Sequence, residues 1–142
     1  MRASGKTVVL TNGVFDILHV GHLRYLEDAK SRGDFLVVAV NNDKSAEAIK
    51  GKGHPLNPVA ERMELLSGLW VVDYVTVFAD ETADRLIELI NPDFYAKGTD
   101  YNTKTLPERK TLKTLNIKPI FVGDRKSHAT SKLIQKIKKK KL

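Results

Sequence analysis

The chain has 142 residues, a net charge of +7 and no cysteine. A chain of this length can bury a normal core but has no room for a second folded domain, so we treat residues 1–142 as one domain. The excess of 24 basic over 17 acidic side chains favours anionic partners such as nucleotides, sugar phosphates or nucleic acid. The lack of cysteine excludes disulfide bonds and thiol chemistry. Because we also find no signal peptide and no apolar run of about 18 residues, we expect a cytoplasmic protein without a membrane span.

Part of the positive charge is concentrated in a lysine-rich tail over about residues 136–142. Lysines at the end of a helix favour the negative pole of its dipole, so we interpret the tail as a solvated helix end. A basic tail can also bind nucleic acid, but the sequence carries no aromatic-rich recognition motif. We therefore do not expect nucleic acid as the partner.

The segment 11–22, TNGVFDILHVGH, carries the main functional signal. It follows an apolar run at 7–10 that is typical of a buried strand, and it precedes apolar residues at helical spacing over 23–29. The unpaired N–H groups in the first turn of such a helix form a natural site for phosphate. His19 and His22 are three residues apart, which places both imidazoles on one side of this turn.

Two glycines give this turn room for a ligand. Gly21 stands between the histidines and Gly13 in the preceding loop, so a phosphate can approach the backbone closely. Paired histidines can also bind a metal or lie on the surface, but the chain has no cysteine and no third ligand at helical spacing. We therefore predict that His19 and His22 bind phosphate and stabilise charge during transfer, and we predict no protein-held metal.

Four stretches, at 11–34, 37–66, 72–78 and 91–101, resemble in order the nucleotidylyltransferase superfamily, in which a His-x-Gly-His pair binds a nucleoside triphosphate. Within it the chain looks most like the adenylyltransferase domain of the bifunctional heptose kinase and adenylyltransferase, which makes ADP-heptose for the lipopolysaccharide core. The resemblance implies transfer of AMP from ATP, with Mg²⁺, to a sugar 1-phosphate, and release of pyrophosphate. It also implies a phosphorylated small-molecule acceptor as the second partner and allows a homodimer.

The apolar run at 35–40 is typical of a strand that is covered on both faces. A strand, a helix and another such strand form a right-handed parallel βαβ unit. Three further strands are expected at 74–78, 94–97 and 117–122, and Pro119 places the last of them at the sheet edge. We therefore predict a single-domain α/β fold with a Rossmann-like, doubly wound parallel sheet of about five strands.

Helices are expected between and after these strands. Asp43 is the predicted N-cap of a helix over 43–50, and Asn57 is that of a helix with Pro58 as its first residue. Further helices are predicted at 82–90, 105–115 and 131–138.

In doubly wound sheets, ligands bind beyond the carboxyl ends of the strands, where the strand order reverses. The segments 11–13 and 41–43 both lie at such ends. In the following basic segment, Lys44, Lys50 and Lys52 can neutralise a triphosphate, although a solvated linker explains them equally well. The resemblance favours Lys50 as a catalytic residue and Lys44 after it.

In the helix that starts near Pro58, we expect Arg62 to face outward beside two glutamates. It can pair with one of them, an interaction of small value, or it can face the active site, as the resemblance implies. Trp70 follows in an apolar turn and is expected in the core or at a subunit contact.

The remaining site residues rest on the resemblance. Asp100 can accept a hydrogen bond from a ribose hydroxyl or cap a turn, and Asp16 can contact a metal indirectly or brace its loop. Ala129-Thr130-Ser131 stands where the family usually has Ser-Thr-Thr or Ser-Thr-Ser, which donates to the β- and γ-phosphates. The predicted nucleotide-binding residues are Asn12, Gly13, Val14, Phe15, Gly21, Lys97, Gly98, Asp100, Thr130 and Ser131, and the predicted substrate-binding residues are Asp16, Asn41, Lys44 and Arg62.

The predicted mechanism needs no general base. A phosphate oxygen of the acceptor is already ionised near neutral pH and attacks the α-phosphorus in line, so the site supplies positioning and charge neutralisation. Alternatives with the same histidine pair are a cytidylyltransferase for glycerol 3-phosphate or phosphoethanolamine and a flavin adenylyltransferase of the FAD synthase type. The non-enzymatic alternative is a nucleotide-binding sensor or a nucleic-acid-binding module.

Overall fold

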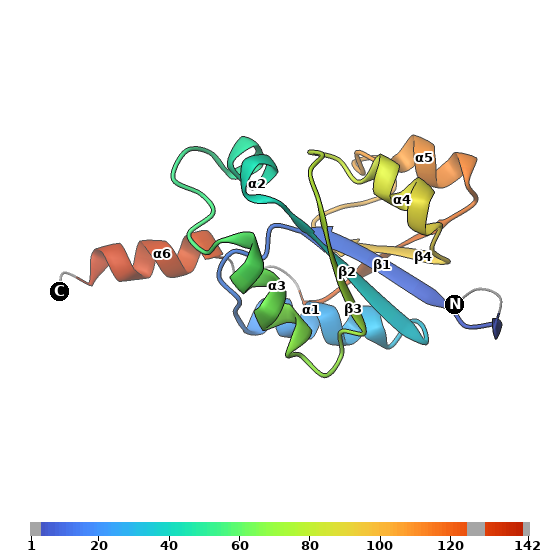
Figure 1. Ribbon diagram of the computed structural model, residues 1–142, viewed down its shortest axis with the longest axis horizontal. Helices are drawn as coiled ribbons and strands as arrows, with labels where there is room; N and C mark the ends of the chain where they lie inside the picture. Colours follow the sequence, from blue (N-terminus) through green and yellow to red (C-terminus); the bar gives the residue numbers. More distant parts are fainter. Residues whose placement is uncertain (1–3, 125–129, 141–142) are drawn as a thin grey trace.

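The computed structural model describes residues 4–124 and 130–140. At its centre is a five-stranded sheet whose neighbouring strands all run parallel. The strands are β1 (Val8–Gly13), β2 (Phe35–Asn41), β3 (Tyr74–Phe78), β4 (Phe94–Gly98) and β5 (Lys118–Val122). Their order across the sheet is β3-β2-β1-β4-β5 (Figure 1), which confirms the predicted doubly wound α/β fold. The position of β5 at an edge confirms the expectation from Pro119.

Helices cover both faces of this sheet (Figure 1). α1 (Val20–Lys30) and α3 (Val59–Ser67) lie on one face, and α4 (Asp84–Ile90) and α5 (Arg109–Thr114) lie on the other. α2 (Asp43–Lys50) follows the carboxyl end of β2, and α6 (Thr130–Lys139) extends away from the body of the domain. None of the helices within 4–124 and 130–140 combines the length and the apolar character that crossing a membrane requires.

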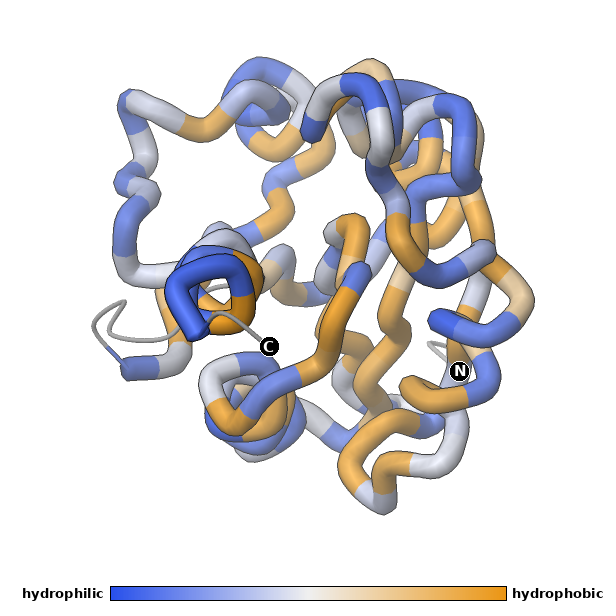
Figure 2. Tube along the Cα trace, turned by 90° about the vertical axis from the view of Figure 1, so that its left-hand side faces the viewer, coloured by the Kyte–Doolittle hydropathy of each residue, from blue (hydrophilic) through white to orange (hydrophobic). Residues whose placement is uncertain are grey.

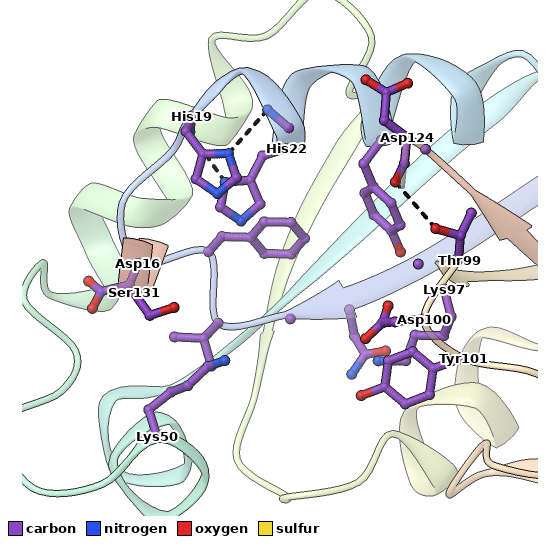
Figure 3. A pocket seen from close by; sticks show the side chains of 18 of the residues that line it. Asp16, His19, His22, Lys50, Lys97, Thr99, Asp100, Tyr101, Asp124 and Ser131 are labelled. Atoms are coloured by element: carbon purple, nitrogen blue, oxygen red, sulfur yellow. Dashed lines mark hydrogen bonds between the residues drawn. The ribbon is translucent and has the colours of Figure 1, made fainter. Parts of the chain in front are cut away.

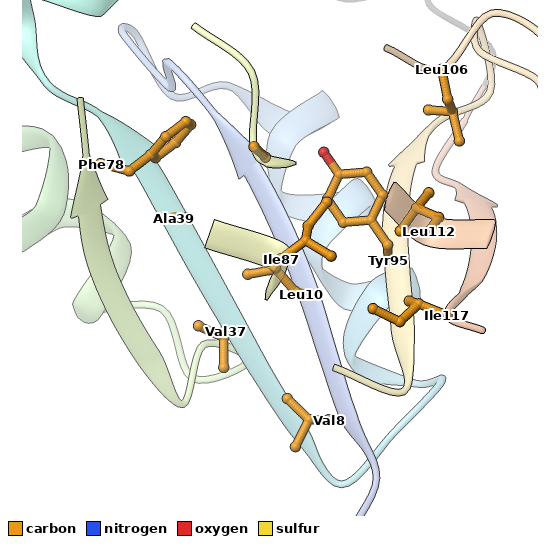
Figure 4. Close-up of a cluster of buried hydrophobic side chains, with 11 residues drawn as sticks. Val8, Leu10, Val37, Ala39, Phe78, Ile87, Tyr95, Leu106, Leu112 and Ile117 are labelled. Atoms are coloured by element: carbon orange, nitrogen blue, oxygen red, sulfur yellow. The ribbon is translucent and has the colours of Figure 1, made fainter. Parts of the chain in front are cut away.

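The alternation of side chains along the strands builds two hydrophobic clusters. In β1, Leu10 belongs to the cluster beneath α4 and α5, and Val9 belongs to the cluster beside α1 and α3. Figure 2 shows hydrophobic segments running through the interior and hydrophilic segments around the outside. Tyr95 joins the first cluster, and its hydroxyl is the one polar side-chain atom drawn in Figure 4. Because the central strands are covered on both faces, the run at 35–40 contains no polar residue.

The register of the strands brings the carboxyl ends of β1, β2 and β4 together. Thr11 pairs with Ala96 across β1 and β4, and Asn12 pairs with Ala39 across β1 and β2. The strand order reverses at β1, and the first turn of α1 follows directly after it in the chain. Open α/β sheets bind their ligands at this position.

Two predicted helix caps are wrong by one residue. Asn42 rather than Asp43 caps α2, because its side chain accepts a hydrogen bond at 2.8 Å from the backbone N–H three residues later. Pro58 rather than Asn57 is the N-cap of α3. The Asn57 side chain instead donates to the carbonyl of Asp16 at 3.0 Å.

The helices predicted at 82–90 and 105–115 are shorter in the structure, since α4 begins at Asp84 and α5 at Arg109. The side chain of Asn102 accepts hydrogen bonds from two following backbone N–H groups, and such bonds compete with a helix. Trp70 is 80% exposed, so its expected place in the core is wrong.

Candidate active site

A cavity of about 640 Å³ lies beyond the carboxyl ends of β1 and β4. Figure 3 shows His19, His22, Ser131 and Lys50 around one end of it and Asp100 and Tyr101 around the other. The structure thus brings together many of the predicted site residues, namely Asn12, Gly13, Val14, Phe15, Asp16, His19, Gly21, His22, Lys50, Lys97, Gly98, Asp100 and Ser131.

His19 and His22 lie side by side at the first turn of α1, with ring centroids 4.0 Å apart. His19 is the N-cap, and its Nδ1 accepts a hydrogen bond from the backbone N–H of Gly21 at 3.1 Å. The Nδ1 of His22 accepts one from the backbone N–H of His19 at 3.3 Å. Because each Nδ1 is an acceptor, each neutral ring carries its proton on Nε2. Nε2 is therefore the donor atom of each ring, and in the structure that of His19 is buried.

The loop between β1 and α1 depends on the backbone at Gly13 and Phe15. Phe15 has a φ of 50°, a left-handed conformation that non-glycine residues rarely adopt. A Cβ at position 13 would lie 3.1 Å from the Phe15 ring, so glycine lets the loop pack against this ring. The ring in turn lies 5.5 Å from that of His22. This packing places the histidine turn beside the end of β1.

Asp16 lies in the cavity wall, but the protein itself engages its carboxylate. The backbone N–H groups of Leu56 and Asn57 donate to it at 2.9 and 3.0 Å, and His54 Nδ1 lies 3.4 Å from Oδ2. Burial disfavours the charged form, but these hydrogen bonds outweigh it and hold the pKa of Asp16 below its ordinary value. Asp16 therefore braces the segment before α3, which is one of its two predicted roles. The structure does not support the predicted direct substrate contact of Asp16, because both of its carboxylate oxygens accept hydrogen bonds from the protein.

Arg62 differs most from its prediction. The sequence predicts an outward side chain, yet Arg62 is fully buried. Its guanidinium donates to the carbonyls of Val14 at 2.6 Å, Asn41 at 2.9 Å and Asn57 at 2.9 Å. It also pairs with Asp43 at 2.7 Å. Arg62 is not among the described residues that line the cavity, so it holds the surrounding loops together and its predicted substrate contact is wrong.

The sequence also predicts Asn41 and Lys44 as substrate contacts, but neither belongs to the described residues of the cavity wall. Asn41 is 2% exposed, and its amide donates to the hydroxyl of Ser45 and the carbonyl of Asp80, both at 3.2 Å. Lys44 lies in the first turn of α2, whereas Lys50, in the last turn, reaches the cavity. Of the two lysines, only the one at the end of this helix reaches the described cavity wall, so the structure does not support the substrate contacts predicted for Asn41 and Lys44.

The other end of the cavity is formed by the segment that ends β4 and follows it. Lys97, Gly98 and Asp100 line the cavity there. A Cβ at Gly98 would lie 2.7 Å from Oδ1 of Asp100, so this close approach favours glycine. The Nζ of Lys97 lies 5.3 Å from the ring centroid of Tyr101, which holds the cation over an aromatic face. A ligand at this end meets a cation, a carboxylate and an aromatic ring.

Tyr25 lines the cavity, although its helical spacing predicts a residue of the apolar face. Its hydroxyl lies 2.5 Å from Oγ1 of Thr11 and donates to the carbonyl of Ala96 at 2.9 Å. Burial raises the pKa of Tyr25, so the phenol keeps its proton. Several other lining residues follow β4 or β5 directly, so the rule that ligands bind at strand ends could have identified them. The lining residues without a predicted role are Tyr25, His54, Thr99, Tyr101, Val122, Gly123, Asp124, Ile134 and Gln135.

One face of α6 bounds the cavity next to the histidine turn. Ser131 lies there with Ile134 and Gln135, at the position where the sequence predicts a phosphate contact. Thr130 begins α6, but its side chain lies outside the described residues, as does the segment 125–129.

The sequence profile of one known family matches almost the whole chain. The family is described as cytidylyltransferase-like, and its profile matches residues 10–141. The chain belongs to the cytidylyltransferase-like family. It is a nucleotidyltransferase.

This nucleotidyltransferase is similar to larger curated proteins. It is 42% identical over 139 residues to the Bifunctional protein HldE of Pseudomonas paraeruginosa, and 50% identical over 105 residues to that of Alkalilimnicola ehrlichii. These matches cover 98% and 74% of the chain but only 29% and 22% of the two relatives. The chain therefore spans less than a third of the length of these relatives.

Solved structures share the fold of this nucleotidyltransferase. The lipopolysaccharide core biosynthesis protein from Thermoplasma volcanium aligns with a TM-score of 0.73 and 29% identity, over 85% of this chain and 99% of that chain. A pantothenate synthetase from Thermus thermophilus aligns with a TM-score of 0.60 and 19% identity, over 82% of this chain and 55% of that chain. At that identity, the second match shows a common fold alone.

The described residues of the nucleotidyltransferase cavity do not form a set of metal ligands. Among the residues that the structure describes, no group of three or more His, Asp or Glu side chains could hold a metal ion. The carboxylate of Asp16 is already engaged by backbone N–H groups. The side chains present therefore do not fit a magnesium ion bound by the protein alone.

Proposed function

We propose that this nucleotidyltransferase transfers AMP from ATP to a sugar 1-phosphate of the heptose type and releases pyrophosphate. The proposal rests on the observation that these residues line one cavity. The histidine turn, Lys50 and Ser131 surround one end of it, and residues 97–101 surround the other. The similarity to HldE over 98% of the chain supports ATP and a heptose phosphate, because the sequence resembles the domain that makes ADP-heptose. The similarity to the Thermoplasma volcanium protein supports a place in lipopolysaccharide core biosynthesis.

In this proposal the triphosphate binds at the first turn of α1. The backbone N–H groups of the turn, Nε2 of His19 and His22 and the ammonium group of Lys50 neutralise its charge. Ser131 adds a hydroxyl donor from α6. The nucleoside then extends toward the other end of the cavity, where Asp100 accepts a hydrogen bond from a ribose hydroxyl.

The reaction is a displacement at the α-phosphorus. A phosphate oxygen of the sugar phosphate attacks, a new P–O bond forms, and the bond from the α-phosphorus to the α–β bridging oxygen breaks. Pyrophosphate leaves with the electron pair of that bond. The attacking phosphate is already ionised near neutral pH, so no side chain has to remove a proton. The residues of the cavity therefore act by orienting the two substrates and by stabilising charge.

Magnesium enters this proposal only as part of the substrate, MgATP. The described side chains offer no metal site of their own, whereas phosphate oxygens are ligands that Mg²⁺ prefers. None of the protein contacts named above depends on where the ion lies.

The test is pyrophosphate release with ATP or CTP, each combined with heptose 1-phosphate, glycerol 3-phosphate or flavin mononucleotide. His22→Ala serves as the inactive variant, and Lys110→Ala, on the exposed surface of α5, is the matched control. We expect release with ATP and heptose 1-phosphate that is lost only in His22→Ala. Release with CTP and glycerol 3-phosphate alone would replace the proposal with the cytidylyltransferase alternative. A silent panel would contradict it.

A further inference from the structure

Asn12 presents one end of its carboxamide to the cavity and the other to the interior. It lies near the carboxyl end of β1 and lines the cavity. Its Oδ1 accepts a hydrogen bond from the hydroxyl of Tyr95 at 2.5 Å. No described residue forms a hydrogen bond with Nδ2, so this N–H₂ group is the donor that Asn12 can offer to a ligand.

Tyr95 is not itself part of the described cavity wall. It is fully buried in the hydrophobic cluster that Figure 4 shows. Its hydroxyl is hydrogen-bonded to Asn12, and its ring lies 5.9 Å from Nζ of Lys97, which also lines the cavity. Burial and the nearby charge of Glu108 raise the pKa of Tyr95, so the phenol keeps its proton. In the structure the phenol is the donor and Oδ1 the acceptor of this bond, so Nδ2 is the end of the amide that is left for another partner.

Glu108, whose charge contributes to this pKa shift, is the residue before α5. It is 2% exposed, and its Oε1 accepts a hydrogen bond from the backbone N–H of Ala83 at 3.1 Å. Its buried Oε2 has no hydrogen-bond partner among the described residues. Buried carboxylate oxygens without a partner are rare. The phenol donates to the amide of the cavity wall, and the nearby charge of Glu108 opposes the loss of its proton.

The geometry points to Tyr95 as the positioning residue that holds the Asn12 carboxamide with Nδ2 directed at an acceptor atom of the bound nucleotide. This inference deepens the proposed function and rests on it, since the ligand is the nucleoside triphosphate. Tyr95 is outside the described cavity wall, and its hydroxyl acts through Asn12.

The first test is a double-mutant cycle on MgATP affinity, measured by calorimetry with Tyr95→Phe, Asn12→Ala and the double variant. Each single variant should bind MgATP about fivefold to tenfold more weakly, the value of one hydrogen bond. The double variant should bind as weakly as Asn12→Ala alone, because Tyr95→Phe keeps the ring beside Lys97 and removes only the hydroxyl that is bonded to Asn12. Wild-type affinity in Tyr95→Phe, or full additivity in the double variant, would overturn the inference. Melting temperatures of all variants separate a loss of fold from a loss of positioning.

The second test needs no nucleotide. In protein labelled with ¹⁵N at asparagine, the side-chain amide signals of Asn12 are identified by their loss in Asn12→Ala. Tyr95→Phe should shift these signals, whereas Tyr74→Phe, at the exposed sheet edge, should not. Unchanged signals in Tyr95→Phe would overturn the positioning role. A wild-type protein that binds no MgATP would instead contradict the proposed function, and these signals would still decide the positioning.

Discussion

The imidazole rings of His19 and His22 lie 4.0 Å apart, and the Nδ1 of each accepts a hydrogen bond from the backbone of the turn that they cap. The same bonds that start α1 therefore determine which ring nitrogen carries the proton. In the proposed function, two roles that are usually separate, helix capping and phosphate binding, therefore depend on the same two side chains.

His22→Ala should lower kcat by about 10²-fold to 10³-fold, because it removes one preorganised donor to the reacting phosphates. It should also destabilise the fold by about 1 kcal/mol through the lost cap. His22→Asn should recover part of the activity and part of the stability, since the amide oxygen can accept a hydrogen bond from the backbone while the amide nitrogen donates to the phosphate. Steady-state kinetics and thermal melting measure the two effects. An alanine variant with wild-type kcat would exclude His22 from the mechanism.

Lys50 and Lys44 provide a matched pair on one helix. Both are exposed lysines of α2, but only Lys50 lines the cavity. Lys50→Ala should raise the KM for ATP about tenfold, which is the loss of affinity expected when one hydrogen bond from a charged group is removed. Lys44→Ala makes the same change in net charge and should leave KM unchanged. Equal effects in the two variants would indicate attraction at a distance rather than contact.

Arg62→Ala should lower the free energy of unfolding by about 3–5 kcal/mol, because it removes the guanidinium donor from a buried hydrogen-bond network. Arg62→Lys should not restore this stability, since an ammonium group cannot reproduce the planar fork of the guanidinium. Asp43→Ala should cost only about 1 kcal/mol, because the side chain of Asp43 is 50% exposed. Urea unfolding measures all three. A normal unfolding free energy with a raised KM would return Arg62 to the substrate site.

Asp16 should make the stability of the fold depend on pH in the acidic range. Its folded-state pKa lies below the ordinary value of 3.8, so its stabilising contribution is fully present above that pH and is lost as pH falls through the folded pKa. Asp16→Asn should destabilise the protein by about 1–3 kcal/mol at neutral pH. The difference between variant and wild type should shrink as the pH falls below about 4. Thermal melting from pH 2 to pH 7 measures it, and a difference that grows in acid would contradict this assignment.

The sequence predicts the parts of the fold that depend on local pattern. The uninterrupted apolar run of β2 indicates a strand covered on both faces, and the single proline of β5 indicates an edge. The histidine turn is also visible, because capping and helical spacing are local properties.

Tertiary packing decides what the sequence does not show. Arg62 belongs to a helix with several charged residues, and nothing local tells which of them is covered by two loops from elsewhere in the chain. Lys44 and Lys50 look alike in sequence, but the direction of α2 brings only one of them to the cavity. Tyr25 and Tyr95 resemble apolar core residues in the sequence. The atoms to which their hydroxyl groups are hydrogen-bonded lie on strands elsewhere in the chain.

The most direct test of adenylyl transfer follows the label from ATP that is radioactive at either the α- or the γ-phosphorus, with heptose 1-phosphate as acceptor. The account predicts that the α-label appears in an ADP-sugar and the γ-label in pyrophosphate. A γ-label on the sugar would show phosphoryl transfer, and an α-label that stays with ATP would show no transfer; either result would contradict the account.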